Sequence, residues 1–286
     1  MLLFILAWAY LLTGAGMGMS AWDMTTLSLF PHKAVSEVTS TGGEMAGMGV
    51  TPRMAKPDMA AAPALQSLAP QGLAPQSPAP WSLGLWSLTI VMWWTMMVAM
   101  MVPSAAPTLL LYGRVQQRAL AHGQGAELAP TWAFAAGYLL VWLGFSVVAA
   151  GLHWALERSG LAPSAMMGSQ SKWLSAGVLA AAGLYQLSPL QNICLDHCRN
   201  PAQFLARHWR PRALGAVKLG ALHGAYCVGC CWMLMGLLFV GGVMNLAWIA
   251  ALALLVLAEK VLPGGRWIAR GGAVVLLIWA GATLLV

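Results

Sequence analysis

All five cysteines of the chain lie in two short segments, and each segment also contains a histidine. These side chains are Cys194, His197 and Cys198 in the first segment, and His223, Cys227, Cys230 and Cys231 in the second. Thiolate sulfur and imidazole nitrogen are ligands for soft or borderline metals. The two segments therefore predict metal binding, with copper(I) as the favoured ion and zinc as the alternative.

The second segment places its four side chains on one face of a helix, because consecutive residues are rotated by about 100°. His223 and Cys230 are nevertheless about 10 Å apart along the axis of such a helix. The four groups therefore cannot bind a single ion together. Two arrangements remain open. In one, two metal sites follow each other along the helix. In the other, ligands come from both segments, for example Cys194, Cys198, His223 and Cys227.

The composition indicates a membrane protein. Of the 286 residues, 59% are hydrophobic and only 8% are charged, whereas soluble domains carry roughly 25% charged residues. The net charge is +7, but the sequence shows no basic patch interleaved with aromatic residues, and nucleic-acid binding is therefore not expected. The predicted fold class is an all-α bundle of transmembrane helices.

Seven segments are apolar enough to be candidate spans, since a helix needs about 20 apolar residues to cross a bilayer. They are residues 1–20, 83–102, 131–154, 173–190, 219–242, 245–258 and 268–286. The first segment lacks a basic start and a small-x-small cleavage site, which favours a retained helix or signal-anchor over a cleaved signal peptide. Cleavage would leave six spans. In either case, residues 83–286 are predicted to form a six-helix metal-binding membrane domain.

The basic residues predict how the spans are oriented, because short cytoplasmic loops are enriched in Lys and Arg. With the N-terminus in the cytoplasm and the C-terminus in the periplasm, the short outside loops hold Arg158 and Lys172. The inside loops then hold Arg114, Arg118, Arg199, Arg207, Arg210, Arg212, Lys260, Arg266 and Arg270. The expected location is the bacterial inner membrane, with lipid as one partner.

Residues 21–82 differ in kind from the rest of the chain. They are rich in Pro, Ala, Ser, Gln and Gly, and such a composition predicts a flexible periplasmic linker. Thioethers bind copper(I), so the linker's methionines are either a capture device or compositional drift. The linker holds Met24, Met45, Met48, Met54 and Met59, and Met17 and Met19 lie just before it.

The second predicted span holds two interleaved pairs of methionines, each one helical turn apart. The pairs are Met96 with Met100 and Met97 with Met101. They resemble the Met-x-x-x-Met device with which eukaryotic copper importers pass copper(I), although methionine is also an ordinary packing residue. The prolines at 103 and 107 predict a break or a kink in this helix.

Glu259 and Lys260 end the sixth predicted span. Charged side chains at the end of a span usually extend to the membrane interface. We therefore expect both to lie at the interface on the cytoplasmic side. The alternatives are a pair between the two side chains, a cap on the bundle, and a proton-binding or metal-binding role for Glu259.

Five ordered motifs give the chain a resemblance to a known family. They are Met96–Ser104, Gln186–Leu190, Cys194–Pro201, His223–Met235 and Glu259–Lys260. Over about residues 83–270 the chain resembles a bacterial family of predicted metal-binding integral membrane proteins of unassigned function, some of which are labelled copper chaperone. The resemblance implies metal binding. It does not specify which metal, or what the protein does with it.

Three functions follow from these patterns. The first is handling of copper(I), by uptake, storage or delivery to a membrane cuproenzyme undergoing assembly, in partnership with that enzyme or with a copper chaperone. The second is a thiol–disulfide oxidoreductase that uses Cys227, Cys230 and Cys231. The third is a metal-stapled structural or assembly subunit of a membrane complex. Neither a phosphate-binding loop nor a Ser/His/Asp arrangement is recognisable, so no catalytic residue is assigned.

Overall fold

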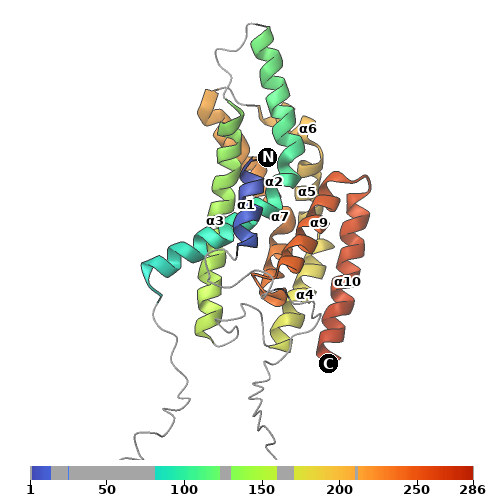
Figure 1. Ribbon diagram of the computed structural model, residues 1–286. Helices are drawn as coiled ribbons and strands as arrows, with labels where there is room; N and C mark the ends of the chain where they lie inside the picture. Colours follow the sequence, from blue (N-terminus) through green and yellow to red (C-terminus); the bar gives the residue numbers. More distant parts are fainter. Residues whose placement is uncertain are drawn as a thin grey trace, which may run out of the picture. The chain divides into compact units, whose positions relative to one another are not determined.

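A computed structural model describes residues 2–13, 25, 81–122, 130–159, 171–209 and 212–285. Within these ranges the chain forms helices and no strand, which confirms the predicted all-α class for the described part (Figure 1). The helices are α1 (Leu2–Leu12), α2 (Leu83–Ala121), α3 (Thr131–Arg158), α4 (Lys172–Gln186), α5 (Pro189–Arg199), α6 (Pro201–His208), α7 (Arg212–Gly236), α8 (Leu238–Gly241), α9 (Leu246–Val261) and α10 (Gly265–Leu285).

Four of the described segments are long and apolar enough to cross a membrane. They are Leu83–Ala121, Thr131–Arg158, Arg212–Gly241 and Gly265–Leu285. The other three predicted spans coincide with α1, α4 and α9, which have 11, 15 and 16 residues. These helices are shorter than the roughly 20 residues that a span needs. Seven spans therefore remains a prediction.

The fourth predicted span ends earlier than expected because the chain starts a new helix there. Helix α4 ends at Gln186, and the Ser188 hydroxyl then caps α5 by accepting a hydrogen bond from the backbone N–H of Gln191 at 3.2 Å. Pro189 takes the first position of α5, where a missing N–H costs nothing. At Pro201, where α5 ends and α6 begins, a proline again takes the first helical position, but the Asn200 side chain makes no capping hydrogen bond. The first cysteine segment is therefore a separate short helix.

Helix α7 lies at the centre of the described bundle. It packs against α3 and α5 most extensively and also contacts α4, α8 and α9. Its approach to α3 needs a small residue, because a Cβ on Gly220 would overlap the backbone carbonyl of Phe134. Close packing through small residues is typical of helices in membranes.

The two prolines of α2 bend the helix without breaking it. Residues 83–121 form one continuous helix with Pro103 and Pro107 inside it. Figure 1 shows α2 (cyan to green) changing direction sharply along its length. Proline removes a hydrogen bond and displaces the preceding turn, and a kink is its usual effect. The kink predicted from the sequence is therefore present.

The ends of the bundle differ in charge. Figure 1 shows the end of α2 and the start of α7 at one end, together with α5 and α6, and the start of α4 and the end of α10 at the other. Most of the described basic residues belong to the first end, among them Arg118, Arg199, Arg207, Arg212 and Arg266. The predicted linker 21–82 lies outside the described residues, except for Thr25, Trp81 and Ser82, and so do the seven methionines from Met17 to Met59.

Candidate metal centre

The two cysteine segments meet because α5 packs along α7. Cys194 of α5 lies against Gly229 of α7, where an added Cβ would be 2.7 Å from its Sγ. One turn further along α5, the Cys198 thiol lies close enough to the thiols of Cys227 and Cys230 to interact with them. Thiols of both segments therefore lie near one another, and a metal site shared between the segments remains a prediction.

Cys227 is at the centre of this group. Its Sγ accepts a hydrogen bond from the Lys260 ammonium at 2.9 Å, and it lies 3.1 Å from the Tyr138 hydroxyl. The same ammonium donates to the Ser104 hydroxyl at 3.3 Å. Helices α2, α3, α7 and α9 therefore all supply polar groups around one buried sulfur.

Cys230 and Cys231 continue the same face of α7, and both are buried. Their thiols donate to the backbone carbonyl of Cys227, at 3.1 and 3.0 Å. Cys231 also approaches the thioether of Met101, with 3.8 Å between the two sulfur atoms. Met101 therefore adds a soft sulfur atom from α2 to the thiols of α5 and α7.

The methionine pairs of α2 are part of the buried core. The side chains of Met96, Met97, Met100 and Met101 are all at most 1% exposed. Only for Met101 does the described part of the chain record a sulfur contact with a cysteine. The relay predicted for the other three remains a proposal.

The two histidines have different surroundings. His223 is buried among the rings of Phe134, Tyr138 and Phe204, and its Nδ1 has no hydrogen-bond partner among the described residues. A buried nitrogen without a partner is costly, and a ligand to it would remove that cost. His223 therefore fits a metal-binding role on the α7 face.

His197 of α5 lies against Tyr226 of α7. Its ring stacks on Tyr226 with 4.1 Å between ring centres, and its Nδ1 is 2.9 Å from the carbonyl of Ile193. It lines a polar cavity of about 220 Å³ between α5 and α6 together with Asp196, Asn200, Gln203, Phe204, Arg207 and His208. His197 thus faces a different environment from the buried thiols.

The thiols of α5 are held in the protonated form. Burial raises the pKa of the Cys194 thiol, and the nearby Cys230 raises it further. Hydrogen bonds with Cys227 and Cys230 raise the pKa of the Cys198 thiol well above its usual value. Because a metal ligand must be a thiolate, binding at these residues releases protons.

The interfacial position expected for Glu259 and Lys260 is wrong. Their exposed fractions are 2% and 6%. Glu259 accepts a hydrogen bond from the Gln186 amide at 3.0 Å, and Lys260 binds Cys227 and Ser104. Both charges have partners inside the bundle, so neither needs to extend to an interface.

Sequence reasoning also missed Tyr138 and Ser104. Nothing in their local sequence distinguishes them, because both belong to apolar helices and are selected only by the packing of α2 and α3 on α7. Lys260 did carry a signal, since an ionisable residue inside a predicted membrane domain is a candidate for function.

The donor atoms fit copper(I), which prefers thiolate and thioether sulfur with imidazole as a further ligand. Within the described residues, no group of three or more His, Cys, Asp and Glu side chains has the geometry to hold a metal ion. The thiols are therefore close neighbours, and they do not form a complete coordination shell.

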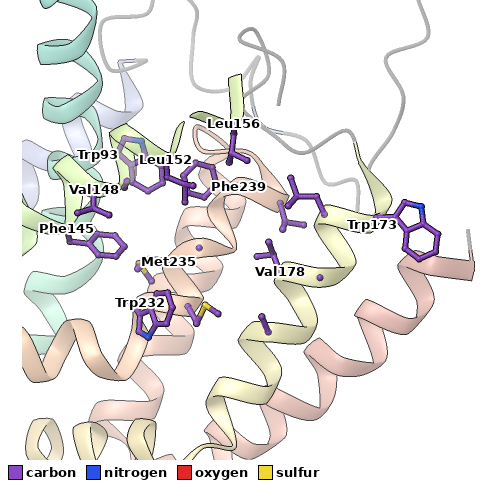
Figure 2. A pocket seen from close by; sticks show the side chains of 17 residues that line it. Trp93, Phe145, Val148, Leu152, Leu156, Trp173, Val178, Trp232, Met235 and Phe239 are labelled. Carbon is purple, nitrogen blue, oxygen red and sulfur yellow. The ribbon is translucent and has the colours of Figure 1, made fainter. Parts of the chain in front are cut away.

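A second cavity lies apart from the thiols. Figure 2 shows this space of about 460 Å³ between α3 and α4, with side chains of α7 and α8 beside it. Its lining is almost wholly apolar and includes Trp93, Phe145, Leu152, Trp173 and Phe239. No Cys or His is among the described residues that line it. It does not have the chemistry of a metal centre.

Comparison with known families identifies the family of the chain. A family model named PpoB2, with the description copper chaperone, matches residues 90–283, which is more than half of the 286 residues. The chain belongs to this copper chaperone family. All the cysteines and histidines of the two segments, and also Met101, Tyr138 and Lys260, lie within the matched range. The resemblance recognised in the sequence is thereby confirmed. Comparisons with curated proteins and with solved structures each gave no match.

Proposed function

We propose that this member of the copper chaperone family is an integral membrane protein that binds copper(I) at the buried thiols and delivers it to a cuproenzyme. The observation that carries the proposal is the meeting of Cys198 with Cys227 and Cys230, beside the Cys231–Met101 contact. Sulfur donors from α2, α5 and α7 therefore lie close together inside the bundle. Zinc is the alternative ion, because it also binds thiolate and imidazole.

The proposed ligands are those predicted from the sequence. Cys227, Cys230, Cys231 and Cys198 form the core of the set, and His223 extends it along α7. Cys194 adjoins this core through Gly229. His197 lies beside the polar cavity between α5 and α6, where an ion on its way to or from the thiols can first be bound. Imidazole binds copper as well as zinc.

The proposed location is the bacterial inner membrane, with the N-terminus inside and the C-terminus outside. Four long apolar helices and the gathering of Arg residues at the α5–α6 end of the bundle support it. Fusions after residue 285 test the orientation. We expect alkaline phosphatase fused there to be active and green fluorescent protein to be dark. The reverse result contradicts the orientation.

The test of metal binding uses the full chain in detergent, loaded with copper(I) without oxygen and then desalted. We expect the wild type to retain copper in a fixed ratio to protein and Cys227→Ser to lose most of it. Met92→Leu is a suitable control, since it removes a buried sulfur about 13 Å along α2 from Met101. Equal copper in the wild type and Cys227→Ser overturns the assignment, and a parallel loading with zinc identifies the preferred ion.

One observation favours a thiol–disulfide oxidoreductase as a second candidate. Cys227 lies beside an ammonium, and reactive thiolates are commonly found next to a cation. All five cysteines are free in the structure. Protein that is purified without metal and with a reducible Cys227–Cys230 disulfide supports this second function. Protein with stoichiometric copper and five titratable thiols after its removal supports the first.

A further inference from the structure

Lys260 is a buried cation without a carboxylate partner. Its exposed fraction is 6%, and its recorded hydrogen bonds go to a thiol sulfur and a hydroxyl. The ion pair recorded among the described residues is Arg266 with Asp196, away from this lysine. An unpaired charge is expensive to bury, and the nearest atom that can supply the counter-charge is the sulfur of Cys227. The neighbouring carboxylate of Glu259 is also buried, but the described residues record no ion pair between it and the ammonium.

We propose that Lys260 determines the charge of the metal ion that the thiol centre accepts, and that it selects a monovalent ion over a divalent one. This inference rests on the proposed function, because it concerns the same thiols. The inference gives a role in metal selection to Lys260, which supplies no ligand atom to the metal. The ion it favours is copper(I), or silver(I) as a chemical stand-in.

The argument is one of charge balance. A monovalent ion held by two thiolates gives a complex of charge −1, which the ammonium neutralises. A divalent ion held by the same two thiolates is neutral, and the ammonium then leaves a buried charge of +1. Whenever the two ions are held by the same number of thiolates, the two bound states differ by one elementary charge. The ammonium then favours the monovalent ion.

The position of the ammonium makes this effect strong. Its nitrogen is 2.9 Å from the Sγ of Cys227, so a metal bound to that sulfur lies within a few ångströms of the charge. Ser104 accepts a second hydrogen bond and holds the ammonium in place. At such separations and in a site screened from water, one unit of charge changes an affinity ratio by at least about tenfold.

The test compares the ratio of silver(I) to cadmium(II) affinity in the full chain in detergent, by competition with chelators of known affinity. We expect Lys260→Met to lower this ratio at least about tenfold and Lys260→Arg to keep the wild-type ratio. Lys218→Met, at an exposed lysine of α7, is the matched control and should leave the ratio unchanged. The same ratio measured with copper(I) and zinc(II) should shift in the same direction.

A purely structural role for Lys260 predicts a different result, namely an equal loss of affinity for both ions, and that outcome overturns the inference. So does an unchanged ratio in Lys260→Met. Should Lys260→Met not fold, Ser104→Asp provides the second variant, because a carboxylate there cancels the ammonium charge and should lower the ratio too. A wild type that binds no soft metal overturns the proposed function itself. If the wild type binds copper but the ratio of silver(I) to cadmium(II) affinity is the same in Lys260→Met, only the role of Lys260 is overturned.

Discussion

The Sγ of Cys194 lies directly against Gly229, with 2.7 Å between the sulfur and the position that a Cβ on residue 229 would occupy. The Tyr185 hydroxyl donates to the carbonyl of the same glycine. The absence of a side chain at Gly229 thus allows a thiol of α5 to lie on the backbone of α7. This contact aligns the two cysteine segments.

Gly229→Ala should displace the Cys194 thiol from α7. Because the overlapping atom is the end of a side chain, the thiol can rotate away, and we expect a cost in stability below about 1.5 kcal/mol. The retention of copper should fall more clearly, since the thiol leaves the cluster. Gly236→Ala is the control, because its Cβ meets nothing within 4 Å. Copper per protein after desalting is the measurement, and equal values for the two variants contradict the prediction.

The packing of α3 on α7 makes a contrasting prediction. A Cβ on Gly220 overlaps the backbone carbonyl of Phe134, which cannot rotate away. We expect Gly220→Ala to destabilise the protein by roughly 1–3 kcal/mol, because the helices must separate. Gly144→Ala in α3, where a Cβ meets nothing within 4 Å, should be neutral. Thermal unfolding in detergent measures both, and a lower unfolding temperature for the Gly144 variant would argue against this account.

Much of the fold follows from local sequence. Long apolar runs predict α2, α3, α7 and α10, because length and hydropathy are properties of each run alone. Pro103 and Pro107 predict the bend in α2 for the same reason. The end of α4 was missed, since an apolar run continues through Ser188 and Pro189 although these two residues start a new helix.

The candidate site is only partly visible in the sequence. The helical periodicity of His223 and Cys227 places them on one face, and the distance between His223 and Cys230 requires ligands from elsewhere. The positions of Tyr138 and Lys260 cannot be predicted from local sequence, because they depend on which helices pack together. Lys260 was expected at an interface, and only its tertiary contact with Cys227 explains why it is buried.

Tyr138→Phe tests the hydroxyl that adjoins the central thiol. The hydroxyl lies 3.1 Å from Cys227 Sγ and also donates to the carbonyl of Met101. A hydrogen bond contributes about 0.5–1.5 kcal/mol net, so we expect copper(I) affinity to fall roughly 2- to 13-fold. Ser146→Ala is the matched control, because it removes a hydroxyl whose recorded hydrogen bond is to the carbonyl of Trp142 in the same helix. Chelator competition measures both, and an identical affinity in the two variants would show that the Tyr138 hydroxyl does not support the bound ion.

Met101→Leu tests whether the thioether is a ligand or only packing. The two side chains have similar volumes, so the cost in stability should stay below about 1.5 kcal/mol. A leucine cannot bind a soft metal, however, and Met101 is the methionine whose sulfur lies 3.8 Å from Cys231. We therefore expect copper(I) affinity to fall in Met101→Leu while Met92→Leu, an equally buried change on the same helix, keeps the wild-type value. If sulfur binds the ion at residue 101, X-ray absorption at the copper edge should also show fewer sulfur neighbours in that variant alone. An unchanged spectrum would assign Met101 to packing, and the ligands would then come only from α5 and α7.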